Sequence, residues 1–203
     1  MRRAHHIALP GLGLGLLIAA LIAAASVSVA LAGATRTQTH IYEAFTSAGS
    51  PAIHVTKTVR GFCNGGSSAI DRDDAWRCFF GNFVVDPCFS SSAAKGVVLC
   101  PTDAWSSSGV EIKLTKALLY GDKGKPSTSG QPWAVETTSG AKCEIDTGAT
   151  SVVDHRRANY FCQKGKDVLW GSPSRSSDPW TIYSAPATAT KLTSKVKLSV
   201  AWF

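Results

Sequence analysis

The sequence lacks the short motifs that identify the common classes of enzyme and metalloprotein. It has no G-x-S-x-G, the turn that presents the nucleophile of many serine hydrolases. No two cysteines lie two to four residues apart, which excludes the usual zinc spacings and a C-x-x-C redox motif. Neither a basic block nor an internal repeat occurs, so we expect no nucleic-acid partner and no solenoid. No cofactor and no metal site is predicted.

Charge is missing from one long stretch near the N-terminus. No residue from Ile7 to Ala34 is charged, and two arginines precede this run. The run ends in small residues, VALAGA, with the A-x-A arrangement of a signal-peptide cleavage site. Residues 1–32 are therefore predicted to be a secretory signal peptide or, because about 20 apolar residues span a bilayer, an uncleaved membrane anchor. Either form places the remaining chain outside the cytoplasm, either extracellular or on the outer face of the cytoplasmic membrane.

The cysteines, in contrast, fit an oxidising compartment. Their number is six, and an even number in an exported chain favours three disulfides. We expect neighbours to pair, since each bridge then closes a loop of roughly 13–20 residues and stabilises the fold by about 3 kcal/mol. The expected bridges are Cys63–Cys78, Cys88–Cys100 and Cys143–Cys162.

Alternation of apolar and polar residues predicts a β fold for the exported part. In VEIKLTKAL, Val110 and Ile112 face one way while Glu111 faces the other, which is typical of a half-buried antiparallel strand. In KVKLSVAWF, the residues predicted to share one face are Val196, Leu198, Val200 and Trp202. Shorter extended runs are separated by turns rich in Gly, Ser and Pro.

These patterns predict a single domain that is mostly β. Residues 33–52 are polar and small, and we interpret them as a spacer with one short ordered piece at HIYEAF. Residues 53–203 are expected to form the domain, an antiparallel β-sandwich or a barrel-like sheet stapled by the three disulfides.

One short α-helix is predicted near residues 71–80, in IDRDDAWRCFFG. Asp71 would be the N-cap and Asp74 would stand at N3, while Gly81 suits the position after the last turn. Acidic side chains in the first turn are favoured by the helix dipole. The alternative is a calcium loop, which needs Gly at its sixth position and Glu at its twelfth. Counted from Asp71, those positions hold Trp76 and Asn82, so the helix is the better interpretation.

No catalytic residue can be assigned. Glu144 and Asp146 flank Ile145, and in an extended segment both carboxylates would point to one side. A carboxylate pair is what a glycan hydrolase needs, but the solvated face of a strand explains this spacing more simply. Asp154 and His155 are neighbours, and neighbours in an extended segment face opposite ways.

Tryptophan provides the candidate binding residues. The exported part holds all six tryptophans, whose large apolar rings and N–H groups suit contact with sugars or with a protein partner. Trp76 and Trp202 fit core positions by periodicity. Trp105, Trp133 and Trp180 adjoin turn residues and are predicted to lie at the rim of a binding site.

Several longer stretches show a resemblance to known proteins. They are DAWRCFFGNFVVDPCF, PWAVETTSGAKC, NYFCQKG followed by LWGSPSRSSDPW, and the terminal VAWF. Over roughly residues 61–203, these stretches resemble an uncharacterised group of secreted and cell-envelope actinobacterial proteins. The resemblance implies an extracytoplasmic, disulfide-bonded β protein and supplies no catalytic residue.

The function expected from the sequence is non-catalytic binding outside the cytoplasm, with a cell-wall glycan or an extracellular protein as the partner. Contact with a membrane is expected only through an uncleaved N-terminal segment. The formal net charge of +7 would favour weak attraction to anionic envelope polymers. One alternative is a cell-wall hydrolase using a carboxylate pair. Another is a secreted protease inhibitor presenting the loop GDKGKPSTSGQ.

Overall fold

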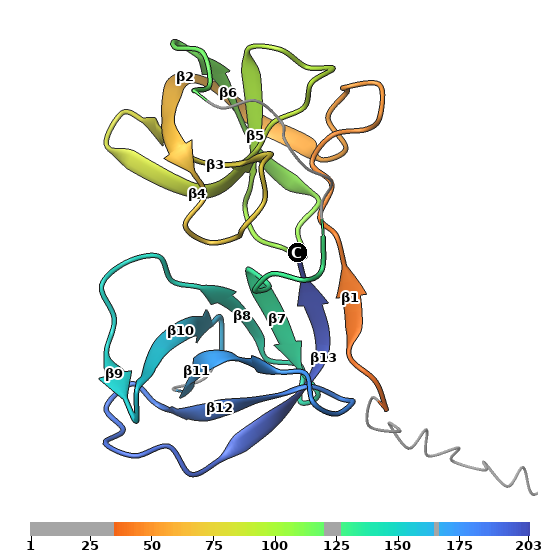
Figure 1. The fold of residues 1–203 in the computed structure, drawn as a ribbon. Coiled ribbons are helices and arrows are strands. Elements are labelled where there is room, and N and C mark those ends of the chain that lie inside the picture. The colour runs from red at the N-terminus through yellow and green to blue at the C-terminus, as the bar shows by residue number, and fades with distance from the viewer. Residues whose placement is uncertain (1–34, 120–126, 165–166) are drawn as a thin grey trace, which may run out of the picture. The chain divides into compact units, whose positions relative to one another are not determined.

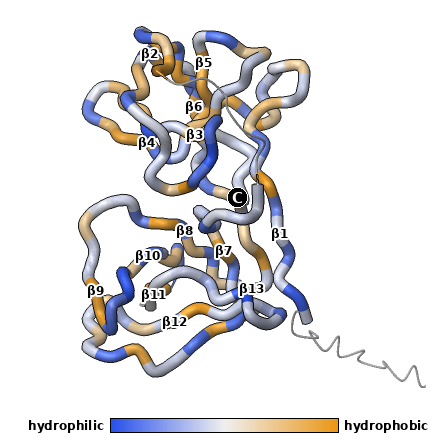
Figure 2. Tube along the Cα trace, viewed as in Figure 1, coloured by the Kyte–Doolittle hydropathy of each residue, from blue (hydrophilic) through white to orange (hydrophobic). Residues whose placement is uncertain are grey.

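The computed structural model describes residues 35–119, 127–164 and 167–203 (Figure 1). Within these residues the chain forms β-strands and no α-helix, which confirms the predicted all-β class. Hydrophobic and hydrophilic residues alternate in short stretches along the chain (Figure 2), as expected for strands with one buried face. The predicted signal peptide or anchor, residues 1–32, lies outside the described residues. No helix in the described part is long and apolar enough to cross a membrane.

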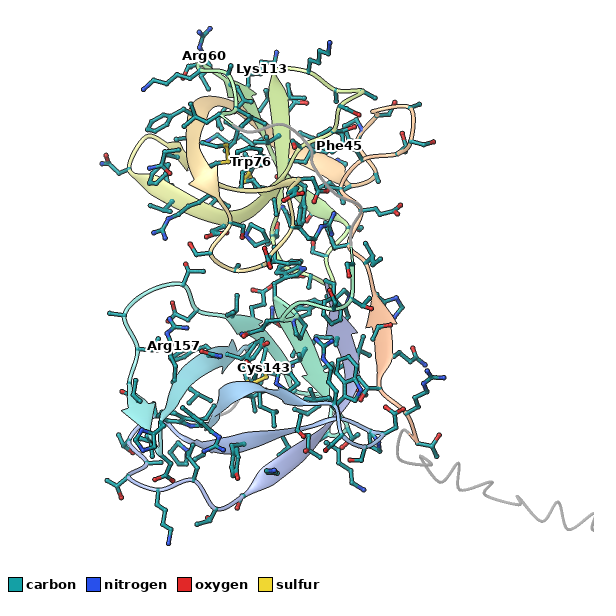
Figure 3. The ribbon with its side chains drawn as sticks, in the orientation of Figure 1. Phe45, Arg60, Trp76, Lys113, Cys143 and Arg157 are labelled. Atoms are coloured by element: carbon teal, nitrogen blue, oxygen red, sulfur yellow. A yellow bond between two sulfur atoms is a disulfide. The ribbon has the colours of Figure 1, made fainter. Side chains whose placement is uncertain are left out.

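The first sheet is a closed barrel of five strands. The strands are β2 (His54–Gly66), β3 (Ala75–Phe80), β4 (Phe83–Phe89), β5 (Val97–Pro101) and β6 (Ser108–Leu114). β2 to β6 follow one another as antiparallel neighbours, and β6 then pairs with β2 in parallel to close the ring. Trp76 fills the interior of this barrel (Figure 3) together with Val98 and Ile112, all of them buried.

The remaining strands form a second sheet, which also closes on itself. The strands are β1 (Gln38–His40), β7 (Ala134–Thr137), β8 (Lys142–Ile145), β9 (Val152–Val153), β10 (Arg156–Cys162), β11 (Asp167–Ser174), β12 (Thr181–Pro186) and β13 (Lys195–Trp202). The order is β1-β13-β12-β11-β10-β8-β7, and an additional pairing joins β13 to β7. The strands thus form two barrel-like sheets, and two of their pairings, β2–β6 and β1–β13, are parallel.

The predicted helix near residues 71–80 is wrong, because Ala75–Phe80 is strand β3. Trp76 and Cys78 are buried inside the barrel whereas Arg77 is half-exposed, so the period is two residues. Cys78 also lies directly opposite Cys63 on β2, and such a cross-strand bridge requires an extended backbone at both ends. Asp71, Asp74 and Gly81 stand at helix-cap spacings by coincidence, and the aromatic residues follow their preference for strands.

The three predicted disulfides are confirmed, including their pairing. Each bridge joins neighbouring strands: Cys63–Cys78 joins β2 to β3, Cys88–Cys100 joins β4 to β5, and Cys143–Cys162 joins β8 to β10. Their Cα–Cα distances of 3.9, 4.0 and 3.8 Å reflect this direct opposition of the two strands. The structure therefore has the bridges that an oxidising compartment permits.

The predicted strands at VEIKLTKAL and KVKLSVAWF are both present, as β6 and β13. In β6 the faces are as expected, with Ile112 buried and Lys113 exposed. In β13 the pairing with β7 slips by one residue between Leu198 and Val200, which is a β-bulge. The bulge exchanges the two faces, so that Ala201 is buried beyond it and Trp202 turns to the outer face.

Part of the segment expected to be a spacer belongs to the fold. Gln38–His40 forms β1, which pairs in parallel with β13, and the Thr37 hydroxyl donates to the carbonyl of Leu198 at 2.8 Å. Tyr42 is buried against Phe89 of the first sheet and Trp133 beside the second. Residues 37–42 therefore contribute to a hydrophobic core that draws on both sheets.

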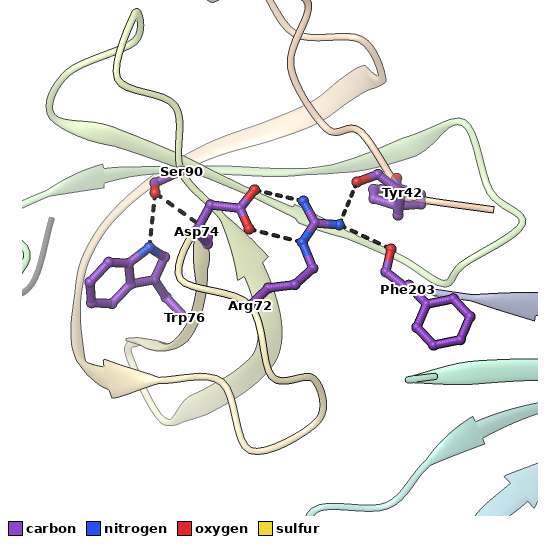
Figure 4. Close-up of polar contacts among 6 residues, drawn as sticks. All are labelled: Tyr42, Arg72, Asp74, Trp76, Ser90 and Phe203. Carbon is purple, nitrogen blue, oxygen red and sulfur yellow. Dashed lines mark hydrogen bonds and ion pairs between the residues drawn. The ribbon is translucent and has the colours of Figure 1, made fainter. Parts of the chain in front are cut away.

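At this core the Arg72 side chain connects its own loop to the segments around Tyr42 and Phe203 (Figure 4). Its guanidinium forms a two-point ion pair with Asp74 and donates to the main-chain carbonyls of Tyr42 and Phe203. It also lies over the Phe89 ring, with Cζ at 4.7 Å from the ring centre. The acidic cluster around residues 71–74 thus supplies a partner for a buried arginine, and Asp71 is exposed.

Candidate functional site

An aromatic platform made of His40, Trp105 and Trp202 lies on the outer face of the second sheet. The Trp105 and Trp202 rings meet edge to face with centres 5.7 Å apart, and the His40 ring stacks on Trp202 at 6.0 Å. His40 is exposed, whereas both tryptophans are half-buried and pack on one side against the hydrophobic core. The Lys142 ammonium lies 5.4 Å from the centre of the Trp105 ring, so a cation borders the platform.

The pairing of four strands positions this face. His40, Trp202, Ala134 and Glu144 are register partners in one row across β1, β13, β7 and β8. The neighbouring row contains Gln38, Val200, Glu136 and Lys142. Because side chains of one row share a face, aromatic, acidic, basic and amide groups lie together on this part of the sheet.

The loop between β5 and β6 brings Trp105 onto the face. The Asp103 carboxylate accepts a hydrogen bond from the Trp105 backbone N–H at 3.1 Å, which fixes the turn. The backbone N–H of Ala104 donates to Glu144 Oε1 at 3.0 Å and attaches the loop to β8.

Glu144 lies beside the platform, and its carboxyl group has a strongly raised pKa. Burial raises the pKa of Glu144 to about 7, the Ala104 N–H opposes this increase, and the charge of Asp103 adds to it. The group therefore exchanges its proton near neutral pH. Asp146, its predicted companion, lies beyond the end of β8 and accepts a hydrogen bond from the Gly148 N–H at 2.7 Å.

The structure places the three candidate tryptophans in different surroundings. Trp105 belongs to the platform. Trp133 is a core residue with 3% of its surface exposed, and its ring packs edge to face against Tyr42. Among the described residues, neither the Trp133 indole N–H nor the Tyr42 hydroxyl has a hydrogen-bond partner.

Trp180 is partly covered by its neighbours. The Arg175 guanidinium lies over its ring at 4.5 Å, and Phe203 contacts it edge to face at 6.4 Å. The same guanidinium donates to the carbonyls of Thr128, Ser129 and Gly130. Arg175 therefore fixes residues 128–130 of the loop predicted to act as an inhibitor, residues 121–131, of which residues 121–126 lie outside the described residues.

Asp154 and His155, the neighbouring acid and histidine considered in the sequence, form a turn. Asp154 and His155 both have positive φ, 47° and 59°, and form the two-residue turn between β9 and β10. Asp154 also accepts a hydrogen bond from the Leu192 N–H at 2.8 Å. The described residues contain no group of three or more His, Cys, Asp or Glu side chains that could hold a metal ion.

A second exposed aromatic surface, the phenylalanine patch, lies on the first barrel. It consists of Phe62, Phe79 and Val84, which share one face of β2, β3 and β4, and of Phe83 at the adjoining β3–β4 turn. Phe62 and Phe79 stack at 5.4 Å, whereas Phe83 stacks on Phe80 at 5.3 Å, and Phe83 and Val84 are 65% and 50% exposed. Exposed apolar residues in such a group favour contact with a protein surface.

Comparisons with known proteins do not assign the chain to a family: no protein-family model, no curated protein and no solved structure matches it.

Proposed function

We propose that this protein is an exported, non-catalytic module that binds a cell-wall glycan on the aromatic platform. The observation that supports this function is the assembly of His40, Trp105 and Trp202 on one outer face from three distant parts of the sequence. The three disulfides support an extracytoplasmic location.

The platform suits a sugar chain for physical reasons. Tryptophan rings offer flat apolar surfaces for the C–H faces of sugar rings, and their N–H groups offer hydrogen bonds. Gln38, Glu136 and Lys142, in the adjoining row, supply donors and acceptors for hydroxyl groups. The site is largely preformed, because His40 and Trp202 project from paired strands and a hydrogen bond to Glu144 attaches the loop of Trp105 to β8.

The proposal is tested by sedimentation of the exported domain with purified cell wall. Trp105→Ala should weaken binding at least about tenfold, because a partly exposed ring at the centre of a binding surface commonly contributes more than about 1.4 kcal/mol. Phe83→Ser, an exposed aromatic on the other sheet, is the matched control and should leave binding unchanged. If Trp105→Ala still binds the cell wall and Phe83→Ser does not, the binding surface is the phenylalanine patch and not the platform. That result would favour a protein partner.

A hydrolase is the second candidate, and Glu144 favours it. A carboxyl group with a pKa of about 7 beside aromatic rings resembles the general acid of a glycosidase, and Asp103 is near enough to affect its charge. Release of soluble fragments from labelled peptidoglycan, abolished by Glu144→Gln, would establish hydrolysis. Binding without release of fragments supports the module.

A further inference from the structure

An open pocket of about 590 Å³ lies at one end of the first barrel. Its two sides are the loop that joins β4 to β5 and the residues that follow β6. The lining includes the apolar residues Val97, Leu114 and Leu118, the hydroxyl of Thr115, and the lysines Lys95 and Lys116. The volume is that of a typical small-molecule site, and barrel mouths are common places for such sites.

The interior of the pocket is apolar. Leu114 and Leu118 pack against the buried cluster that fills the barrel, so the pocket floor continues the barrel core. A backbone hydrogen bond joins the two sides, in which the Leu114 N–H donates to the carbonyl of Gly96 at 2.8 Å. A ligand that buries a hydrocarbon chain here would replace water on these leucines and on Val97.

The charge at the pocket has one sign. Lys95 and Lys116 belong to the lining, and none of the described lining residues is acidic. The Lys116 ammonium lies 4.9 Å from the centre of the Phe62 ring, and neither lysine forms an ion pair within the described residues. Two cations beside an apolar floor fit a molecule with an anionic group at one end and a hydrocarbon body.

We propose that this pocket binds a single-chain anionic amphiphile, with its carboxylate or phosphate group near Lys95 and Lys116 and its chain against Leu114, Leu118 and Val97. The site is on the first sheet and is separate from the aromatic platform, so it does not depend on the proposed glycan binding. A sugar would leave the leucines unused, and a neutral lipid would leave both lysines unused.

Titration calorimetry on the exported domain tests the site with octanoate, decanoate, decyl phosphate and decanol. Saturable one-to-one binding is expected, with affinity rising about fourfold per added methylene group, the equivalent of about 0.8 kcal/mol. Decanoate or decyl phosphate should bind at least about tenfold more tightly than decanol, and the better of the two identifies the head group.

Two variants make the test specific. Lys95→Gln with Lys116→Gln should remove the preference for the anions over decanol, whereas Lys57→Gln, on β2 and outside the pocket lining, should keep it. Leu118→Asp should weaken all three decyl probes. Equal affinity for decanol and decanoate, binding that does not saturate, or an unchanged preference in the double lysine variant would overturn the proposal.

Discussion

Arg72 and Asp74 form a two-point ion pair at the edge of the core, with Nη2 2.6 Å from Oδ2 and Nε 2.9 Å from Oδ1. The arginine side chain is 3% exposed and the aspartate side chain 22%. The remaining arginine nitrogen, Nη1, donates to Tyr42 O at 2.8 Å and Phe203 O at 3.0 Å. One buried cation thus joins the segment around Tyr42, the first barrel and Phe203 at the end of β13.

Replacement of this arginine should therefore destabilise the whole domain. Arg72→Met should lower the free energy of unfolding by about 3 kcal/mol, because the buried Tyr42 carbonyl and the partly buried Asp74 carboxylate lose their donor. The Phe203 carbonyl keeps the hydrogen bond from the Tyr42 N–H. Urea denaturation measures the loss. Asp71→Ala is the control and should change stability by less than about 0.5 kcal/mol, since Asp71 is exposed. A loss of about 1 kcal/mol in Asp71→Ala would show that Asp71 contributes to stability in spite of its exposure.

Glu144 should make stability depend on pH. Its pKa is raised by burial to about 7 in the folded protein, whereas the ordinary value is 4.5. The folded state therefore binds more protons than the unfolded state between these values, and stability falls as pH rises through this window. We expect a fall of about 1–2 kcal/mol, reduced by partial solvent screening.

The measurement compares the wild type with Glu144→Gln between pH 4 and 8. The variant keeps an oxygen that can accept the Ala104 N–H, so its stability should lack this part of the pH dependence. Parallel curves for the two proteins would show that Glu144 does not titrate in this window.

The disulfides should contribute to stability individually. The Cys143–Cys162 bridge has a sequence separation of 19 and joins two strands of the second sheet. Its removal in Cys143→Ala with Cys162→Ala should cost about 3 kcal/mol through the greater freedom of the unfolded chain. Thermal unfolding with and without reductant provides the comparison, and a reductant that does not lower the melting temperature of the wild type would contradict this expectation.

The sequence predicted those features that depend on local patterns. Alternation in β6 and the close spacing of the cysteines identified a strand and all three bridges, because both follow from residues near one another in the chain. Strand β3 was misassigned because six residues contain too few periods to separate a helix from a strand, and its partners β2 and β4 decide the outcome.

The candidate site could be predicted only in part for a related reason. Trp105 was identified from its turn, but His40 lies on a three-residue strand that exists through pairing with β13. Trp202 was predicted to face the core, and it does pack against the core cluster. The bulge beside Ser199 leaves it half-buried and on the opposite face from Leu198. No signal in the sequence marks that bulge. The buried position of Trp133 likewise depends on Tyr42, a residue far away in the chain.

Two glycines of strand β2 provide a matched test of how closely the barrel strands pack. A Cβ atom at Gly61 would meet the carbonyl oxygen of Phe79 and the Cγ2 atom of Ile112, whereas a Cβ at Gly65 would meet nothing within 4 Å. Neither glycine has positive φ, so backbone strain does not distinguish them.

Gly61→Ala should accordingly lower the free energy of unfolding by about 1–3 kcal/mol, because the extra methyl group has to push a neighbouring strand away. Gly65→Ala should be neutral or slightly stabilising, since it restricts only the unfolded chain. Denaturation curves of both variants at one pH give the comparison. Equal stabilities of the two variants would mean that the barrel tolerates a wider separation of β2 and β3 at Gly61. Closure of the barrel would then depend mainly on the side chains around Trp76, and less on close contact between backbones.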